Sequence, residues 1–315
     1  MTCIFSLQAM AEIRLKPELV YQQVQMALNE RKVLKAYDLW EQAVSKTADG
    51  WASLPNYNET TARLKQQRGL LNLVFTDTKK RSDWVPMEKY TQCADFLSIE
   101  YSYKSHAGSI KMRADFEGGE LNITELATLM RDIVVLPRIS PLFSAEHPQM
   151  YERFFTTAAL VSVKSKYPAL WNTGSKQVSV NFYDCMQEHG AIAVCYDWDQ
   201  DDKNSIKNVE PNTLAVLMFP ARQRMTIYLH VRRPTTYLST EWMDRNFICY
   251  NLHPTVISLV DMSRKLNLLD PDMAETIDRM WAKNGMKPVH SGSPLGGEHE
   301  YDSEFFQWVQ RALRC

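Results

Sequence analysis

Three aspartates spaced two apart follow an apolar run at 191–196, and their chemistry stands out first. Asp197, Asp199 and Asp201 could share a divalent cation, since Ca²⁺ and Mg²⁺ prefer oxygen ligands. An EF-hand that starts at Asp199 does not fit, because Lys203 would then occupy a ligand position and its positive charge opposes cation binding. The pattern therefore favours a hydrated strand end, and a metal-dependent enzyme that uses these aspartates is an alternative hypothesis.

A stretch of alternating basic and aromatic residues near 224–232 offers a second kind of chemistry. Residues two apart on a strand share a face, so these side chains are expected to face outward while the apolar residues between them face inward. Basic side chains can contact phosphates and an aromatic ring can stack on a base. RNA binding is therefore a second alternative hypothesis. Its candidate residues are Arg222, Arg224, Tyr228, His230, Arg232 and Arg233.

Composition limits the classes of function. The 315 residues suit one large domain or two modest ones, and the formal net charge of -1 gives no overall attraction to nucleic acid or to an anionic membrane. There are 11 glycines, where average usage of about 7% would give about 22. Neither a glycine-rich phosphate loop nor a nucleophile elbow is found. We therefore predict a protein that is not an enzyme and that needs no cofactor.

The six cysteines are scattered, which predicts reduced thiols. Cys185 and Cys195 are expected to lie diagonally on paired strands and to remain free. No apolar stretch approaches the roughly 20 residues of a membrane helix. The first residues lack the basic region of a signal peptide. These features predict an intracellular, cytoplasmic protein without a membrane partner.

Alternating apolar residues between 97 and 116 predict a β-hairpin. A four-residue loop at 105–108 pairs Tyr103 with Ile110 and keeps the apolar side chains on one face. The same pattern predicts four strands within 177–233.

Two details of those four strands can be predicted. A three-residue loop at 188–190 pairs Phe182 with Tyr196. The stretch Thr213–Phe219 is apolar at nearly every position, which is typical of a central strand covered on both faces.

Helical periodicity and capping residues predict the remaining elements. The expected helices span 17–46, 59–75, 122–135, 149–166, 240–251, 254–267 and 271–283.

The end of the chain combines a glycine-rich tether at 290–300 with an amphipathic helix at 303–314. Its apolar stripe can fold back on its own domain or bind a neighbouring subunit. Eight tryptophans also favour protein interfaces, where this residue is enriched. The candidate interface residues are Phe305, Trp308, Val309 and Leu313.

Together these patterns predict an α+β fold, with helices packed around two antiparallel hairpin systems in a two-lobe architecture. The expected parts are a helical lobe with one hairpin at 1–140, an antiparallel sheet with helices at 141–289, and the tether with its helix at 290–315. We predict a structural or assembly protein whose partners are its own copies or other protein subunits, with a viral capsid or capsid-associated subunit, located in the virion, as the specific hypothesis. RNA is the alternative partner.

Overall fold

The described residues belong to two compact units, Met1–Leu73 and Val74–Cys315. Neither unit tests the three-part division expected at residues 140 and 290, which stays a prediction. Among the described helices, none is both long and apolar enough to cross a membrane. The computed structural model describes residues 17–46, 57–79, 82–87, 98–106, 109–117, 123–130, 140, 149–155, 158–164, 175–198, 212–232, 246 and 252–260.

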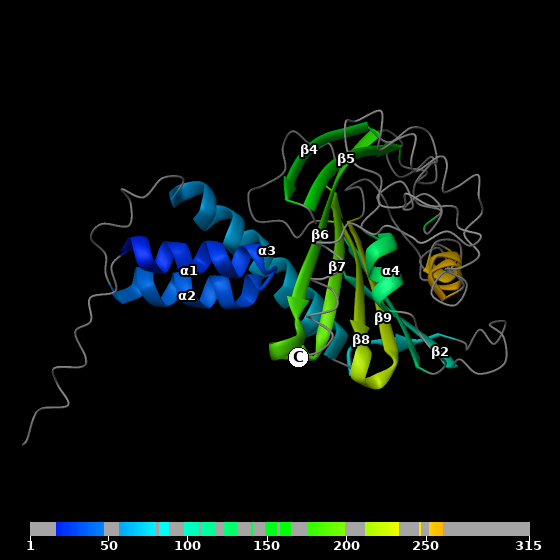
Figure 1. The fold of residues 1–315 in the computed structure, drawn as a ribbon. Helices are drawn as coiled ribbons and strands as arrows, with labels where there is room; N and C mark the ends of the chain where they lie inside the picture. Colours follow the sequence, from blue (N-terminus) through cyan, green and yellow to red (C-terminus); the bar gives the residue numbers. More distant parts are fainter. Residues whose placement is uncertain are drawn as a thin grey trace, which may run out of the picture. The chain divides into compact units, whose positions relative to one another are not determined.

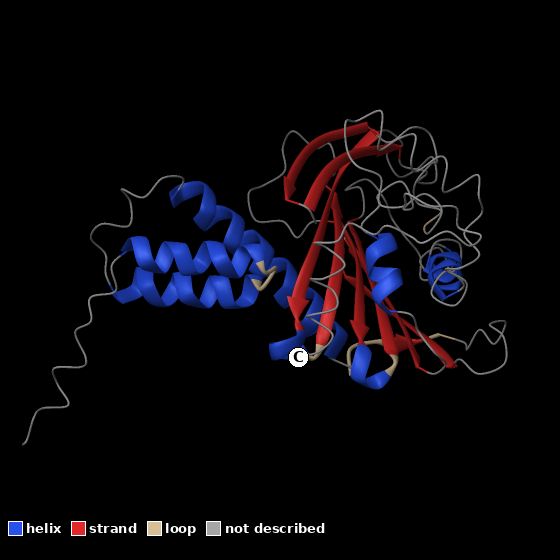
Figure 2. Ribbon diagram, in the orientation of Figure 1, coloured by secondary structure: helices blue, strands red, loops and turns tan. Residues whose placement is uncertain are grey.

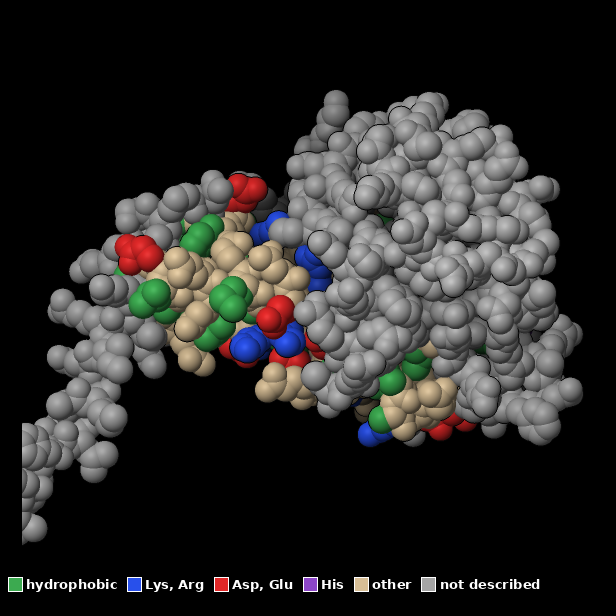
Figure 3. All heavy atoms as spheres, in the orientation of Figure 1, with side chains coloured by type: hydrophobic (Ala, Val, Ile, Leu, Met, Phe, Trp, Pro, Cys, Tyr) green, Lys and Arg blue, Asp and Glu red, His purple; other side chains and the backbone are tan. Residues whose placement is uncertain are grey.

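The first unit is helical. Its first helix buries side chains at helical spacing, Val20, Val24, Ala27 and Leu28, as the amphipathic pattern predicts. Exposed hydrophobic side chains stand as separate spots among polar atoms rather than as one patch (Figure 3). The helices are α1 (Pro17–Asn29), α2 (Val33–Lys46) and the first part of α3 (Tyr57–Lys79).

A tight turn separates α1 from α2. Arg31 adopts a left-handed φ of 63°, and the Lys32 amide donates to the Ala27 carbonyl at 2.8 Å. This is the usual way in which a left-handed residue ends a helix. The stretch 17–46 is therefore helical as predicted, but it forms two helices.

Gly69 lies in the interior of α3, where glycine is less favourable than alanine by roughly 0.5–1 kcal/mol. A Cβ atom at this position would meet no heavy atom within 4 Å. We expect Gly69→Ala to raise the free energy of unfolding by about 0.5–1 kcal/mol in urea denaturation. The exposed Ala62 of the same helix provides the reverse control, because Ala62→Gly should lower stability by a similar amount. A loss of stability in Gly69→Ala would show that α3 requires glycine there.

The second unit contains one continuous antiparallel sheet with the strand order β1-β2-β3-β9-β8-β7-β6-β5-β4 (Figures 1 and 2). The prediction of two separate hairpin systems is wrong, because β3 pairs with β9 and so joins the two hairpins into one sheet. The strands are β1 (Val85–Pro86), β2 (Ser98–His106), β3 (Ser109–Glu117), β4 (Gln149–Phe155), β5 (Ala158–Lys164), β6 (Ser175–Cys185), β7 (Ala191–Trp198), β8 (Asn212–Phe219) and β9 (Arg224–Arg232).

Both predicted hairpins form, with a shift of two residues. Tyr103 pairs with Met112 rather than with Ile110, and Phe182 pairs with Val194 rather than with Tyr196. The short helix α6 (Met186–His189) followed by a left-handed Gly190 makes the second turn. Because a shift of two residues keeps each side chain on its face, the predicted facing survives.

The predicted helix at 149–166 is wrong, since this stretch forms β4 and β5. The helix expected at 122–135 is present as α4 (Ile123–Met130) within the described residues. Residues 252–260 are helical as well. The helices expected near 240–251 and 271–283 and at 303–314 lie wholly or almost wholly outside the described residues.

The sheet has two chemically different faces. The apolar face consists of alternate side chains from six strands. None of these side chains belongs to a residue that is more than 4% exposed. The opposite, polar face carries the charged residues of β2, β3 and β9. The apolar face comprises residues 101 and 103 of β2, the even residues 110–116 of β3, 178–182 of β6, 192–198 of β7 and 214–218 of β8, and the odd residues 225–231 of β9.

Candidate functional site

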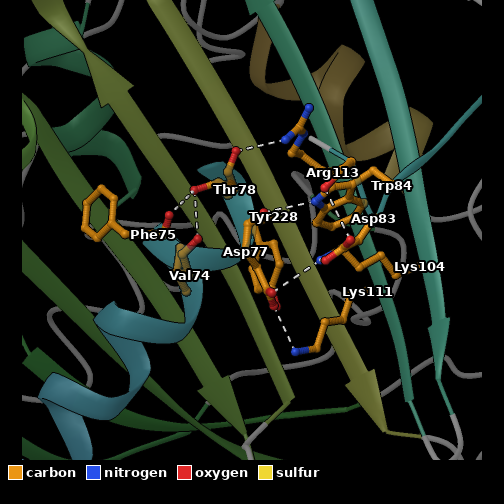
Figure 4. A network of polar contacts seen from close by, with 11 residues as sticks. Val74, Phe75, Asp77, Thr78, Asp83, Trp84, Lys104, Lys111, Arg113 and Tyr228 are labelled. Atoms are coloured by element: carbon orange, nitrogen blue, oxygen red, sulfur yellow. Dashed lines mark hydrogen bonds and ion pairs between the residues drawn. The ribbon is translucent and has the colours of Figure 1, made fainter. Parts of the chain in front are cut away.

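The last turn of α3 is bound to the polar face through Asp77 (Figure 4). Lys111 Nζ and the Tyr228 hydroxyl each donate to Asp77 Oδ2 at 2.8 Å. Lys104 Nζ lies 3.5 Å from the other carboxylate oxygen. Arg113 donates to the Thr78 carbonyl at 2.8 Å. One carboxylate thus holds three side chains from β2, β3 and β9.

The surroundings of Asp77 keep it ionised. Burial acts to raise the pKa of Asp77, but hydrogen bonds from Lys111 and Tyr228 and the charges of Lys111 and Lys104 outweigh it, so the pKa lies below its ordinary value. The Trp84 indole donates to the Asp77 carbonyl at 3.0 Å, and its ring centroid lies 4.7 Å from Lys104 Nζ. The indole ring therefore adds a cation–π contact to the cluster.

Asp115 forms a second centre of opposite charges on the same face. Arg113 and Arg224 each lie 2.8 Å from a carboxylate oxygen of Asp115, and the Thr226 hydroxyl donates to it at 2.6 Å. Arg113 and Arg224 thus pair with an acid of the same sheet. Together with the Asp77 cluster, these ion pairs make this part of the polar face a structural surface beside the last turn of α3.

The residues proposed for RNA contact do not form an open platform. Tyr228 and His230 are fully buried, and Arg224 is committed to Asp115. The expectation that this face points outward is wrong, because the end of α3 covers it, and a buried ring cannot stack on a base. Of the other candidates, Arg222 is exposed, Arg232 is half-buried, and Arg233 lies outside the described residues.

The aspartates proposed as metal ligands are only partly described. Asp197 ends β7, where its Oδ1 accepts a hydrogen bond from the Thr213 hydroxyl at 2.8 Å. Asp199 and Asp201 lie outside the described residues, so their role as ligands stays a prediction. Among the residues that the structure describes, no three histidine, cysteine or carboxylate groups come together as a metal site.

Two thiols are buried in the sheet. Cys185 and Cys195 are free, as predicted. Burial raises the pKa of both thiols well above the ordinary value, so neither has the thiolate character of a reactive cysteine.

The apolar face is covered in part by α4, which contributes the buried residues Ile123, Leu126, Ala127 and Met130. The Tyr196 hydroxyl reaches from β7 to the Met130 carbonyl at 2.6 Å, so the last turn of α4 is tied to this face. Figure 2 shows α4 and the helix at 252–260 beside the sheet.

The helix at 252–260 contacts the edge of the same face. The Tyr101 hydroxyl and His253 Nδ1 are 2.7 Å apart, and Thr255 donates to the Ser140 hydroxyl at 3.2 Å. Burial lowers the pKa of His253, which favours the neutral imidazole. The polar contacts at this edge are therefore made by neutral groups.

Asn212, the first residue of β8, adds a buried amide to the apolar face. It has no exposed surface, and by register it lies beside Trp198 of β7. Its Oδ1 accepts a hydrogen bond from the Arg232 amide at 2.7 Å, whereas its Nδ2 is buried without a hydrogen-bond partner among the described residues. Sequence reasoning missed this residue and also Asp77, because each acts through contacts distant in sequence.

Comparisons with known proteins give structural matches alone, since no family model and no curated protein matches the sequence. A STAR-related lipid transfer protein of Xanthomonas axonopodis is 12% identical, covers 58% of this chain and 99% of its own, and has a TM-score of 0.43. Human StAR-related lipid transfer protein 5 is 11% identical, with 66% and 99% coverage and a TM-score of 0.43. The human StarD13 lipid transfer and protein localization domain is 12% identical, with 62% and 95% coverage and a TM-score of 0.38.

The assembly and virion hypotheses are not carried further. The structures named above carry the names of lipid-transfer proteins or domains, and no capsid or assembly subunit is among them; at TM-scores below 0.5 they assign no function to this chain. RNA binding is withdrawn as well, since its central residues are buried. The metal-dependent enzyme finds no support in the described residues, among which no three potential ligands come together. Phe305, Trp308, Val309 and Leu313 lie outside the described residues, and their role in protein contacts stays a prediction.

Proposed function

We propose that the chain binds an apolar or amphipathic small molecule against the apolar face of its sheet, beside α4 and the helix at 252–260. The observation that carries the proposal is the unbroken apolar surface of six strands, rich in aromatic rings and with few polar groups. Small-molecule sites in proteins are lined mainly by hydrophobic and aromatic side chains, with a small number of placed polar groups. The same surface forms the core of the unit, so ligand and core side chains share it.

The contrast between the two faces supports this choice. On the polar face Lys111, Arg113 and Arg224 are paired with Asp77 and Asp115, so these charges are already neutralised by protein groups. On the apolar face the placed polar groups include the Tyr101–His253 pair at one edge and the Asn212 amide at the start of β8. An amphipathic molecule could bury its chain between these two polar positions.

The test compares matched substitutions on the two faces. Ala114 lies on the apolar face and Ala215 on the polar face, and both are fully buried in adjoining parts of the sheet. Adding a leucine side chain to a packed position costs about 1–3 kcal/mol. We expect Ala114→Leu to weaken binding of methyl palmitate about tenfold or more, measured by native mass spectrometry, and Ala215→Leu to leave it nearly unchanged.

Circular dichroism shows whether both variants remain folded. Failure of the unmodified protein to bind any long-chain compound would refute the proposed function. Equal loss of binding in both folded variants would place the ligand elsewhere than the apolar face.

A further inference from the structure

The structure assigns Asn212 as the residue that recognises the polar end of the bound molecule, which we infer to be a neutral amphiphile with an oxygen acceptor. This inference rests on the proposed function and specifies its ligand. Its basis is the side-chain amide of Asn212, which is fully buried on the apolar face. The oxygen of this amide accepts a hydrogen bond, whereas its nitrogen has no hydrogen-bond partner among the described residues.

The orientation of the amide is fixed by its other atom. Since the Arg232 backbone amide can only donate, the atom that it contacts at 2.7 Å must be the oxygen of Asn212. The nitrogen therefore occupies the other terminal position of the planar side-chain amide, directed away from the Arg232 amide. A buried donor without a partner costs about 1–3 kcal/mol. A ligand that supplies the acceptor removes this cost.

The neighbours of Asn212 determine which acceptor suits it. Trp198 lies opposite it on β7, and Leu214 follows on the same face of β8. No lysine or arginine side chain that the structure describes lies on the apolar face. A buried carboxylate or phosphate without a cation is strongly disfavoured. The chemistry thus favours an ester carbonyl or a hydroxyl group at the end of a long apolar chain.

The test uses three probes of the same chain length: hexadecane, methyl palmitate and palmitate. We expect the full chain to bind methyl palmitate about 2- to 10-fold more tightly than hexadecane, the gain of one net hydrogen bond. Asn212→Leu keeps a similar volume and should abolish this preference while hexadecane still binds. Asn212→Ala removes the donor without introducing an ionisable group, so it should lose the preference too.

Each outcome separates this inference from the proposed function. Equal binding of hexadecane and methyl palmitate by the unmodified protein would overturn the role of Asn212 and leave the apolar site standing. Tighter binding of palmitate than of methyl palmitate would overturn the neutral class of ligand. If none of the three probes binds, the proposed function itself fails. Should Asn212→Leu not fold, Asn212→Ala provides the same comparison.

Discussion

Replacement of Asp77 with alanine is expected to lower the free energy of unfolding by about 3–5 kcal/mol, because it leaves the buried Lys111 without its counter-charge and Lys104 with only the exposed Asp83. The side chains of Lys104 and Lys111 are 5% and 11% exposed, so water cannot replace the lost carboxylate fully. Tyr228 also loses its acceptor. Since a domain is stable by about 5–15 kcal/mol, a loss of this size is a large share of the total. Urea denaturation measures it.

Asp83 provides the matched control for Asp77. It also faces Lys104, at 3.9 Å, but its side chain is 57% exposed. An exposed ion pair contributes about 0–1 kcal/mol, so Asp83→Ala should change stability little. If the two variants lost similar stability, the burial of the Asp77 cluster would not be the source of its effect. Asp77→Asn keeps the size of the side chain and offers a milder variant if alanine prevents folding.

The charge of Asp77 also predicts a response to acid. Its pKa in the folded protein lies below the unfolded value, so its stabilisation is complete above the unfolded pKa, near 3.9, and is lost as the pH falls through the folded pKa. The unmodified protein should therefore lose stability below about pH 4 more steeply than Asp77→Asn does. Parallel stability curves for the two proteins below pH 4 would contradict this assignment.

Local pattern predicted which way the side chains of the central strands point, but not their exact pairing. Alternation fixes whether Phe182 and Tyr103 face the core, since a slip of one residue would expose every apolar side chain. It does not distinguish registers that differ by two residues. The predicted loop lengths of both hairpins are therefore wrong, whereas the predicted face of each side chain is right.

The stretch 149–166 shows where periodicity fails. Its periodicity predicts a helix, yet the stretch forms two strands, β4 and β5, at the edge of the sheet. Val161 and Val163 are β-branched and favour strands, and β5 pairs along its length with β6. Pairing with a distant neighbour decided the structure, and no local pattern contains it.

The same limit explains the missed polar cluster. Asp77 and Tyr228 are separated by 151 residues, and neither belongs to a recognisable motif. The alternation at 224–232 identified a polar face correctly. Alternation alone predicts that this face is exposed, because local sequence does not show that the end of α3 covers it.

Replacement of Phe116 with alanine is expected to lower the free energy of unfolding by about 3–5 kcal/mol, the usual cost of removing a buried aromatic ring. Phe116 lies on the apolar face beside Met225 and is 1% exposed. Glu117, the next residue, is exposed, and Glu117→Ala should change stability by less than about 1 kcal/mol. Thermal and urea denaturation measure both.

Phe116→Ala also connects the packing of the apolar face to its proposed ligand. Removing the ring leaves space on a face that already suits long apolar chains, and such a cavity favours an apolar occupant. A molecule that binds only the folded state stabilises it in proportion to the logarithm of its concentration. We therefore expect methyl palmitate to recover part of the stability that Phe116→Ala loses. Asp77 lies on the opposite face of the sheet. Methyl palmitate should therefore stabilise Asp77→Ala no more than it stabilises the unmodified protein. Equal stabilisation of both variants by the compound would mean that the space left by Phe116 adds nothing to its binding.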